Sequence, residues 1–223
     1  MMRVKTAFTL AEVLVTLMII GVIAAMTIPG LRKNADMQEY VAGCKKAHTT
    51  ISNAMRAAEM EHGDFKRWGF KDGDDDSIQK VGDYLTANMN ILRKCEPNKP
   101  GCWTQTRKLN GTGNIGTETG IGENSLSFTT ADGMNWSLDG GGASVSGVTN
   151  NIGTHFRAFV DINGDKKPNM MGYDVFVFIV DANRGVVPAG ADNNSANCSQ
   201  TSTNNYAGVD CAAKVIKEGK ITY

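Results

Sequence analysis

The sequence predicts an α+β protein in which one long N-terminal helix packs on a head built around an antiparallel β-sheet. Three observations predict this fold. Residues 8–28 are almost entirely apolar, and residues 31–62 carry apolar side chains at spacings of three and four. Beyond residue 62 the pattern changes to short alternating runs between glycine-rich turns, which is typical of strands. We therefore expect a helix at 8–62 and a head at 63–223.

The composition suits a folded chain and argues against a nucleic-acid partner. Of the 223 residues, 41% are hydrophobic and 21% are charged, which is typical of a chain with a packed core. Lysine and arginine together number 23, as do aspartate and glutamate, and the formal net charge is zero. A protein without an excess of cations gains little from displacing the counterions of a phosphate backbone. We expect no nucleic acid among the partners.

The apolar run from Phe8 to Ile28 is close to the ~20 residues that an α-helix needs to cross a bilayer. Arg3 and Lys5 precede it, which favours a cytoplasmic N-terminus. The run is longer than the apolar core of an ordinary signal peptide. Two alternatives stay open: an ordinary signal peptidase site near Ala24, and a single-pass anchor that is never cut.

Glu12 places a carboxylate inside this apolar helix, which costs roughly 2.5–3.5 kcal/mol on insertion scales. Such a residue signals a function, and its partner should be a cation. A cut between Ala7 and Phe8 creates an α-amino group four residues before Glu12. In a helical stack of subunits, the amine of one chain can meet the Glu12 of its neighbour, because pairing in a low dielectric offsets the desolvation of both charges. Glu12 would then set the register of assembly.

The ten residues KTAFTLAEVL, at positions 5–14, resemble the cleavage and methylation motif of type IV prepilins and type II secretion pseudopilins. The resemblance implies that a prepilin peptidase removes residues 1–7 as a leader and N-methylates Phe8. It also implies that Glu12 is the glutamate that this family uses in assembly. Ala7 departs from the family pattern, which usually has glycine immediately before the cut.

A pilin-like fold and a structural function follow from this resemblance. The chain would enter the inner membrane through residues 8–28, with its head in the periplasm. It would then polymerise through its helix into a type IV pilus or a type II secretion filament, some of which reach the cell surface. Its partners would be the prepilin peptidase, copies of itself and other pilin-like subunits.

Two other functions stay open. One is a membrane-tethered binding module outside the cytoplasm that does not polymerise. The other is an anchored secreted enzyme, although the sequence has no His-Glu-x-x-His, Gly-x-Ser-x-Gly or phosphate-loop motif. We therefore expect no enzymatic activity and name no catalytic residue.

The second part of the helix, residues 31–62, is predicted to be amphipathic and to dock on the head through one apolar stripe. It should end at His62, because Gly63 can supply a stop. Pro29, which the resemblance equates with a helix-loosening proline of the family, removes a backbone donor. We expect a kink or a melted stretch around Gly21 to Gly30. The stripe consists of Met37, Tyr40, Val41, Cys44, Ala47, Ile51, Ala54, Met55 and Ala58.

Four strands of the head can be placed from its apolar runs. Leu126–Leu138 is predicted to be a hairpin around an Asp132-Gly133 turn. Residues 155–160 form a further strand, and residues 175–180 are uniformly apolar, as in a strand buried on both faces. Exposed glycine-rich loops are expected at residues 110–124 and 139–153.

Five cysteines are present, and no Cys-x-x-Cys motif occurs. Cys95 and Cys102 would close a short loop, and Cys198 and Cys211 a longer one of the kind that pilins commonly carry. Two bonds among five cysteines allow other pairings, which the sequence leaves open. Disulfides would place the head in an oxidising compartment. Cys44 lies on the helix stripe, either as a small buried residue or bonded to a head cysteine.

Asp161, Asn163, Asp165 and Asp174 space oxygen ligands as calcium loops do. The pattern is not an EF-hand, because its glycine comes too early and Gly172 stands where the bidentate glutamate belongs. The alternative is a polar turn in which aspartate and asparagine side chains brace the backbone between two strands. Calcium is therefore the only cofactor that the sequence suggests.

Overall fold

The computed structural model describes residues 8–71, 73–122, 124–140, 155–192 and 197–223. Residues 1–39 and residues 40–223 form two compact units, and each is described by itself below. The expected leader at residues 1–7 and most of the expected loop at 139–153 lie outside the described residues.

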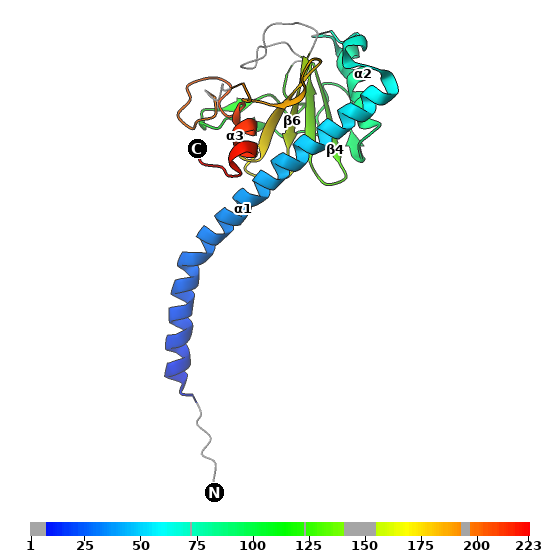
Figure 1. Ribbon diagram of the computed structural model, residues 1–223. Coiled ribbons are helices and arrows are strands. Elements are labelled where there is room, and N and C mark those ends of the chain that lie inside the picture. The colour runs from blue at the N-terminus through cyan, green and yellow to red at the C-terminus, as the bar shows by residue number, and fades with distance from the viewer. Residues whose placement is uncertain (1–7, 72, 123, 141–154, 193–196) are drawn as a thin grey trace. The chain divides into compact units, whose positions relative to one another are not determined.

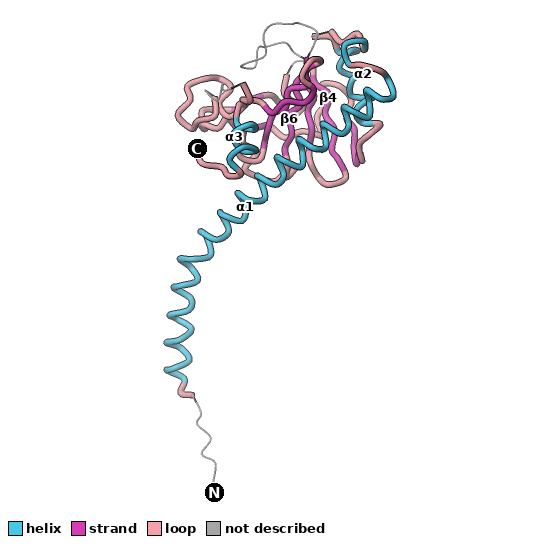
Figure 2. The backbone as a smooth tube through the Cα atoms, in the orientation of Figure 1, coloured by secondary structure: helices cyan, strands magenta, loops and turns pink. Residues whose placement is uncertain are grey.

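The helix α1 (Leu10–His62) begins two residues later than predicted and ends where predicted. It ends because Gly63 adopts a φ of 81°, a left-handed conformation that stops a helix. The backbone is helical through Pro29, so the expectation of a melted stretch is wrong (Figures 1 and 2). One proline removes one helix hydrogen bond, and the turns on either side keep theirs. A kink at Pro29 stays a prediction.

Within residues 1–39, the large apolar side chains lie exposed. From Phe8 to Leu31 each of them is at least 45% exposed. The hydroxyl groups of Thr16 and Thr27 donate to carbonyl oxygens of the preceding turn, at 2.9 and 3.0 Å. These polar groups therefore need no water. By length and composition the segment can cross a membrane, a test that a signal sequence also passes.

The head is built on a six-stranded antiparallel sheet with the strand order β1-β4-β5-β6-β7-β8. Among the described residues of the head, two further strands form a separate two-stranded sheet, and two helices and a short 3-10 turn follow α1 in the chain. The six strands are β1 (Ile91–Lys94), β4 (Ser125–Thr130), β5 (Asn135–Asp139), β6 (His155–Asp161), β7 (Val175–Asp181) and β8 (Gly185–Pro188). The other elements are β2 (Thr106–Arg107), β3 (Asn114–Ile115), α2 (Asp75–Thr86), α3 (Cys211–Glu218) and the 3-10 turn (Phe65–Arg67).

The α+β class is confirmed, and so are the strands placed from the sequence. β4 and β5 meet through the Asp132-Gly133 turn, which is closed by a 2.9 Å hydrogen bond from the Thr130 N–H to the Met134 carbonyl. β6 and β7 cover the two predicted strands, and every residue of β7 is buried. The sheet has two strands more than the four that were predicted. The additional strands, β1 and β8, lie at its edges and have only four residues each.

The main apolar core lies on one face of the sheet, under α1, α2 and α3 (Figure 1). The predicted stripe of α1 is buried there from Val41 onward, with Ala47, Ile51 and Ala58 fully buried. Small residues let the helix lie close, since a Cβ added at Gly43 would stand 2.6 Å from the Ile162 side chain. Each large apolar side chain buried here contributes about 1.5–3 kcal/mol, so the stripe holds the helix on the sheet.

The other face of the sheet is polar at β4 and β5 and is covered by the chain between β1 and β4. The Ser127 hydroxyl donates to the Thr119 carbonyl at 2.9 Å, and the Ile121 N–H donates to the Ser137 hydroxyl at 3.0 Å. Ile115 and Ile121 are buried against β6 and β7. The prediction that residues 110–124 form an exposed loop is therefore wrong at Ile115 and Ile121, because the backbone of the loop bonds to serine hydroxyls on the sheet and these two side chains are buried.

Gly120 should tolerate no side chain, because a Cβ there would lie 2.4 Å from the Ser125 hydroxyl oxygen and 2.7 Å from that of Ser137. Gly113 is the matched control: its φ is 141° against 147° for Gly120, and a Cβ there meets nothing within 4 Å. Both alanine variants carry a backbone strain of about 1–3 kcal/mol. Overpacking should cost Gly120→Ala a further ~1–3 kcal/mol in the free energy of unfolding. Equal losses in denaturant unfolding of the two variants would contradict this close packing.

Candidate functional site

The N-terminal end of α1 is closed by a reciprocal capping pair, Thr9 and Glu12. The backbone N–H and the hydroxyl of Thr9 both donate to Glu12 Oε2 at 2.8 Å. The Glu12 N–H donates back to Thr9 Oγ1 at 3.2 Å. This is a capping box, in which two backbone donors at a helix start are satisfied by two side chains. The Thr-x-x-Glu spacing in the sequence is the signal for this capping box. The charge of Glu12, on which the prediction was based, does not reveal it.

The predicted processing and assembly residues lie at or before this helix start. Phe8 is 87% exposed and directly precedes Thr9, whereas Ala7 lies outside the described residues. Both hydrogen bonds that the described residues give to the Glu12 carboxylate go to Oε2. The other oxygen, Oε1, is the atom that a second partner would use. Pairing of Glu12 with a neighbour's amine stays a prediction.

Two disulfides cross-link the head. Each joins a cysteine to the cysteine nearest to it in the sequence, which is the pairing that closes the shortest loops. Cys95 is bonded to Cys102, and Cys198 to Cys211. Loops of this size typically add roughly 3 kcal/mol to the free energy of unfolding. Cys44 is a free thiol that is fully buried on the α1 stripe. The structure thus agrees with the first of the two interpretations of Cys44, a small buried residue.

The β6–β7 connection holds the four residues proposed as calcium ligands. Asp174 is its hub, since its carboxylate accepts hydrogen bonds from the N–H groups of Asn169 and Met170 at 2.8 and 2.7 Å. It also accepts one from the Asn163 side-chain amide at 3.3 Å. Asp161 Oδ1 accepts from the Asn163 N–H at 3.3 Å. These hydrogen bonds agree with the alternative to a calcium loop, a polar turn in which aspartate and asparagine side chains brace the backbone.

Asp165 has hydrogen-bond partners of its own outside the β6–β7 connection. Its Oδ1 accepts hydrogen bonds from the Thr104 hydroxyl at 2.7 Å and from the Asn135 amide at 2.9 Å. Among the described residues, no three His, Cys, Asp or Glu side chains gather as metal ligands. Asn163 Oδ1 is buried, and the described residues give it no hydrogen-bond partner. That oxygen is the atom in this turn best suited to an added cation, and calcium binding stays a prediction.

Burial changes the acidity of the two inner aspartates. Desolvation, with the charge of Asp174 as the next cause, raises the pKa of Asp161 to about 9. Desolvation also raises the pKa of Asp174 to about 6, against the opposing effect of its backbone hydrogen bonds. The turn therefore holds a proton near neutral pH, which reduces the repulsion between the two carboxyl groups.

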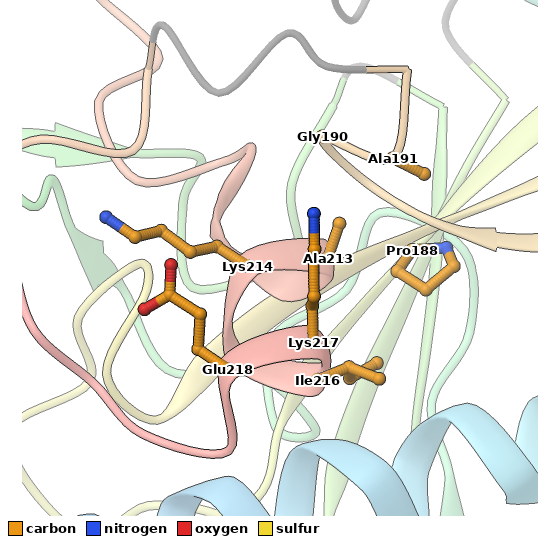
Figure 3. Close-up of a pocket in the computed structure, with 8 residues that line it drawn as sticks. All are labelled: Pro188, Gly190, Ala191, Ala213, Lys214, Ile216, Lys217 and Glu218. Carbon is orange, nitrogen blue, oxygen red and sulfur yellow. The ribbon is translucent and has the colours of Figure 1, made fainter.

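A groove of about 450 Å³, which sequence reasoning did not foresee, lies between the end of β8 and α3 (Figure 3). In Figure 3 the Lys217 side chain extends toward the Gly190–Ala191 turn, while Lys214 and Glu218 point to the other side. Its ionisable lining, among the described residues, consists of two lysine amines and one glutamate carboxylate. It is lined by Pro188, Gly190, Ala191, Ala213, Lys214, Ile216, Lys217 and Glu218.

Comparison of the chain with protein-family models, with curated proteins and with solved structures gave no match. The class of protein is therefore argued from the residues themselves.

The stability of the head should fall as pH rises from about 4 to about 9. Asp161 and Asp174 have folded-state pKa values near 9 and 6, above the ordinary value of 3.8, so the folded chain binds more protons than the unfolded chain. Their contribution is complete below pH ~4 and is lost as pH rises through ~6 and then ~9. Each pKa unit is worth about 1.4 kcal/mol, or roughly 4 °C in Tm for a chain of this size.

Thermal unfolding of the full chain in detergent, followed across this pH range, measures the effect. Asp161→Asn should flatten the upper part of the profile, because asparagine resembles the protonated acid and cannot ionise. Asp76→Asn, at an exposed aspartate of α2, is the control and should leave the slope unchanged. An unaltered slope in Asp161→Asn would show that this carboxyl group does not titrate with folding.

The calcium hypothesis has a separate test at pH 8, where an ion would replace the proton in the turn. Calcium at about 100 times its Kd should raise the free energy of unfolding by about 2.7 kcal/mol, and magnesium at the same concentration should not. Asp174→Asn should remove the gain. The same Tm in calcium, in magnesium and in a chelator would contradict a calcium site at Asp161, Asn163, Asp165 and Asp174.

Proposed function

We propose that this chain is a structural subunit of a filament of the type IV pilus or type II secretion class. A prepilin peptidase cuts it between Ala7 and Phe8, and residues 8–28 anchor it in the inner membrane before it polymerises through α1. One observation carries the proposal. The first half of α1 leaves its large apolar side chains exposed, whereas the second half buries its stripe on the head.

The exposed half of α1 needs surroundings other than water. Burying one large apolar side chain is worth about 1.5–3 kcal/mol, and contiguous exposed apolar patches mark interaction sites or membrane segments. Lipid meets this need for a single subunit, because all helix hydrogen bonds are internal. The packed helices of other subunits meet it in a filament. A helix of this kind can therefore leave the lipid and pack against copies of itself.

Glu12 supports a function that goes beyond anchoring. The capping box satisfies one oxygen of its carboxylate, yet the negative charge would still be desolvated in lipid or in a packed helical core. The amine of Phe8 in a neighbouring subunit is the cation that processing would create. Pairing the two favours one stagger between neighbouring helices, which is what a filament requires.

The disulfides support placement of the head outside the cytoplasm. Cys95–Cys102 and Cys198–Cys211 are both closed, and disulfides persist in oxidising compartments. Together with the basic residues Arg3 and Lys5 before the apolar segment, this supports a single-pass orientation with the head in the periplasm.

The groove beside α3 favours a second candidate function, a tethered binding module that does not polymerise. Its volume of about 450 Å³ lies within the range of small-molecule sites. Lys217 would give it a preference for an anionic group. In that case α1 would be only an anchor, and Glu12 would have no partner on another chain.

The two functions differ in what Glu12→Ala does. In a filament subunit the variant should still reach the membrane and fold, because Glu12 is exposed at the helix start, but its incorporation into sheared filaments should fall more than about tenfold, or 1.4 kcal/mol per subunit. Glu39→Ala, an exposed glutamate further along α1, is the matched control and should assemble normally. Normal assembly of Glu12→Ala, or no filament from the wild-type chain, would favour the tethered module.

A further inference from the structure

Two pairs of basic residues that are far apart in the sequence lie together in the head. One pair lies at the end of β2, and the other lies in the β6–β7 connection. The Arg107 N–H donates to the Asn169 carbonyl oxygen at 2.7 Å, and the Thr104 hydroxyl donates to Asp165 Oδ1 at 2.7 Å. These two hydrogen bonds join the two segments at both ends. The resulting group, the basic pole, consists of Arg107, Lys108, Lys166 and Lys167.

The basic pole faces solvent with an excess of positive charge. Three of its four side chains are exposed, and Lys108 is half-buried. The inner aspartates of the turn, Asp161 and Asp174, are buried. Asp165 is exposed beside Lys166 in the chain, and its Oδ1 already accepts two hydrogen bonds. The exposed charge at this end of the head is therefore positive.

An acidic group of residues begins α2. Asp74 is the residue before the helix, and Asp75 and Asp76 lie in its first turn, where negative charge suits the helix dipole. Asp75 and Asp76 are exposed. The Lys71 N–H donates to the Ser77 hydroxyl at 3.1 Å, so one exposed cation lies near this group without balancing it. We call Asp74, Asp75 and Asp76 the acidic pole.

The strand β5 separates the two poles. At its start, the Asn135 amide donates to Asp165 Oδ1 at 2.9 Å, next to the basic pole. Immediately after its end, the Gly140 carbonyl oxygen accepts from the Gly73 N–H at 3.0 Å, next to the acidic pole. At about 3.3 Å per residue, these two contacts lie about 17 Å apart along the strand. The head therefore carries opposite charges at the two ends of β5.

We propose that the two poles form one contact between copies of this chain, in which the acidic pole of one head docks on the basic pole of the next. The inference deepens the proposed function and rests on it for the supply of neighbouring copies. Opposite charges attract and like charges repel, so the contact favours one relative orientation of the heads. Because two different surfaces meet, each pair of heads leaves one pole of each kind free, and further copies can be added.

A double variant of the full chain, Asp76→Cys with Lys167→Cys, tests the contact by crosslinking in the envelope and in the sheared-surface fraction. A disulfide needs Cα atoms within about 7 Å, so these positions at opposite poles of one head cannot bond to each other. A mild oxidant should give a ladder of dimers, trimers and longer species on a non-reducing gel. Added salt should lower the yield of the ladder several-fold, because it screens exposed charges.

Lys217 provides the matched control, because it is an exposed lysine of α3 that belongs to neither pole. Asp76→Cys with Lys217→Cys should give no ladder, and Asp76→Cys alone should give no dimer.

Charge reversal is the second measurement. Asp76→Lys and Lys166→Glu should each lower the amount of sheared filament about tenfold, because like charges then face each other. The two changes together in one chain should restore it, because opposite charges meet again. Lys217→Glu should not rescue Asp76→Lys.

The head contact is overturned if the wild-type chain forms filaments but the Asp76–Lys167 cysteine pair crosslinks no more than the Lys217 control, and the filament proposal would then stand. A dimer from Asp76→Cys alone would also overturn it, because the contact would then be symmetric. If the wild-type chain forms no filament, the proposed function fails, and crosslinking in the envelope decides for or against the head contact by itself.

Discussion

The apolar side chains of α1 are accommodated in two different ways along one helix, and the other features of the chain depend on this difference. From Val41 to Ala58 they form one stripe that is buried on the sheet. From Phe8 to Leu31 they surround the helix and lie exposed. A stripe on one side fixes the helix to a single head, whereas apolar residues on all sides require lipid or other helices. The proposed function follows from the exposed apolar residues 8–31. The fold of the head follows from the buried stripe.

The two faces of the sheet are covered through different interactions. The face under the helices is closed by burial of aliphatic and aromatic side chains. At β4 and β5 the opposite face is closed by hydrogen bonds between serine hydroxyls and the backbone of a glycine-rich segment. The β6–β7 turn uses the same means, with the Asp174 carboxylate as acceptor for backbone N–H groups. These hydrogen bonds offset the burial of polar groups in both places, although Ser125 Oγ and Asn163 Oδ1 find no hydrogen-bond partner among the described residues.

Both edges of the sheet carry features that oppose strand addition. β8 ends in Pro188, which has no N–H to donate, and His48 of α1 lies 3.3 Å from the Val186 carbonyl oxygen. β1 has a register shift and carries the charged residues Arg93 and Lys94. Charges, proline and irregular pairing are the means by which proteins protect edge strands. Strand pairing between two heads through these edges is thus disfavoured.

Sequence periodicity was sufficient for the parts of the fold that depend on long apolar patterns. It placed the end of α1 at His62, the stripe on that helix, the Asp132-Gly133 hairpin and the buried strand β7. It missed β1 and β8, because four residues are too few for a periodic signal. It also missed the burial of Ile115, Gly120 and Ile121 within a loop that is otherwise largely exposed, since composition does not reveal that Ser125 and Ser137 provide a polar surface beneath Gly120.

The interactions at the candidate sites were predictable only where the interacting residues lie close together in the sequence. Cysteines seven and thirteen residues apart pair as loop closure suggests. The capping box of Thr9 and Glu12 was visible in the sequence, but the charge of Glu12 drew attention to a partner on another chain.

The most direct test of the account is the mass of the intact chain and of its N-terminal peptide, recovered from envelope and from sheared-surface fractions. The account predicts a chain that begins at N-methylated Phe8, with Cys95, Cys102, Cys198 and Cys211 oxidised and Cys44 reduced, in both fractions. A chain that begins at Met1 or near Ala25, and that is absent from the sheared fraction, would contradict processing and assembly through α1.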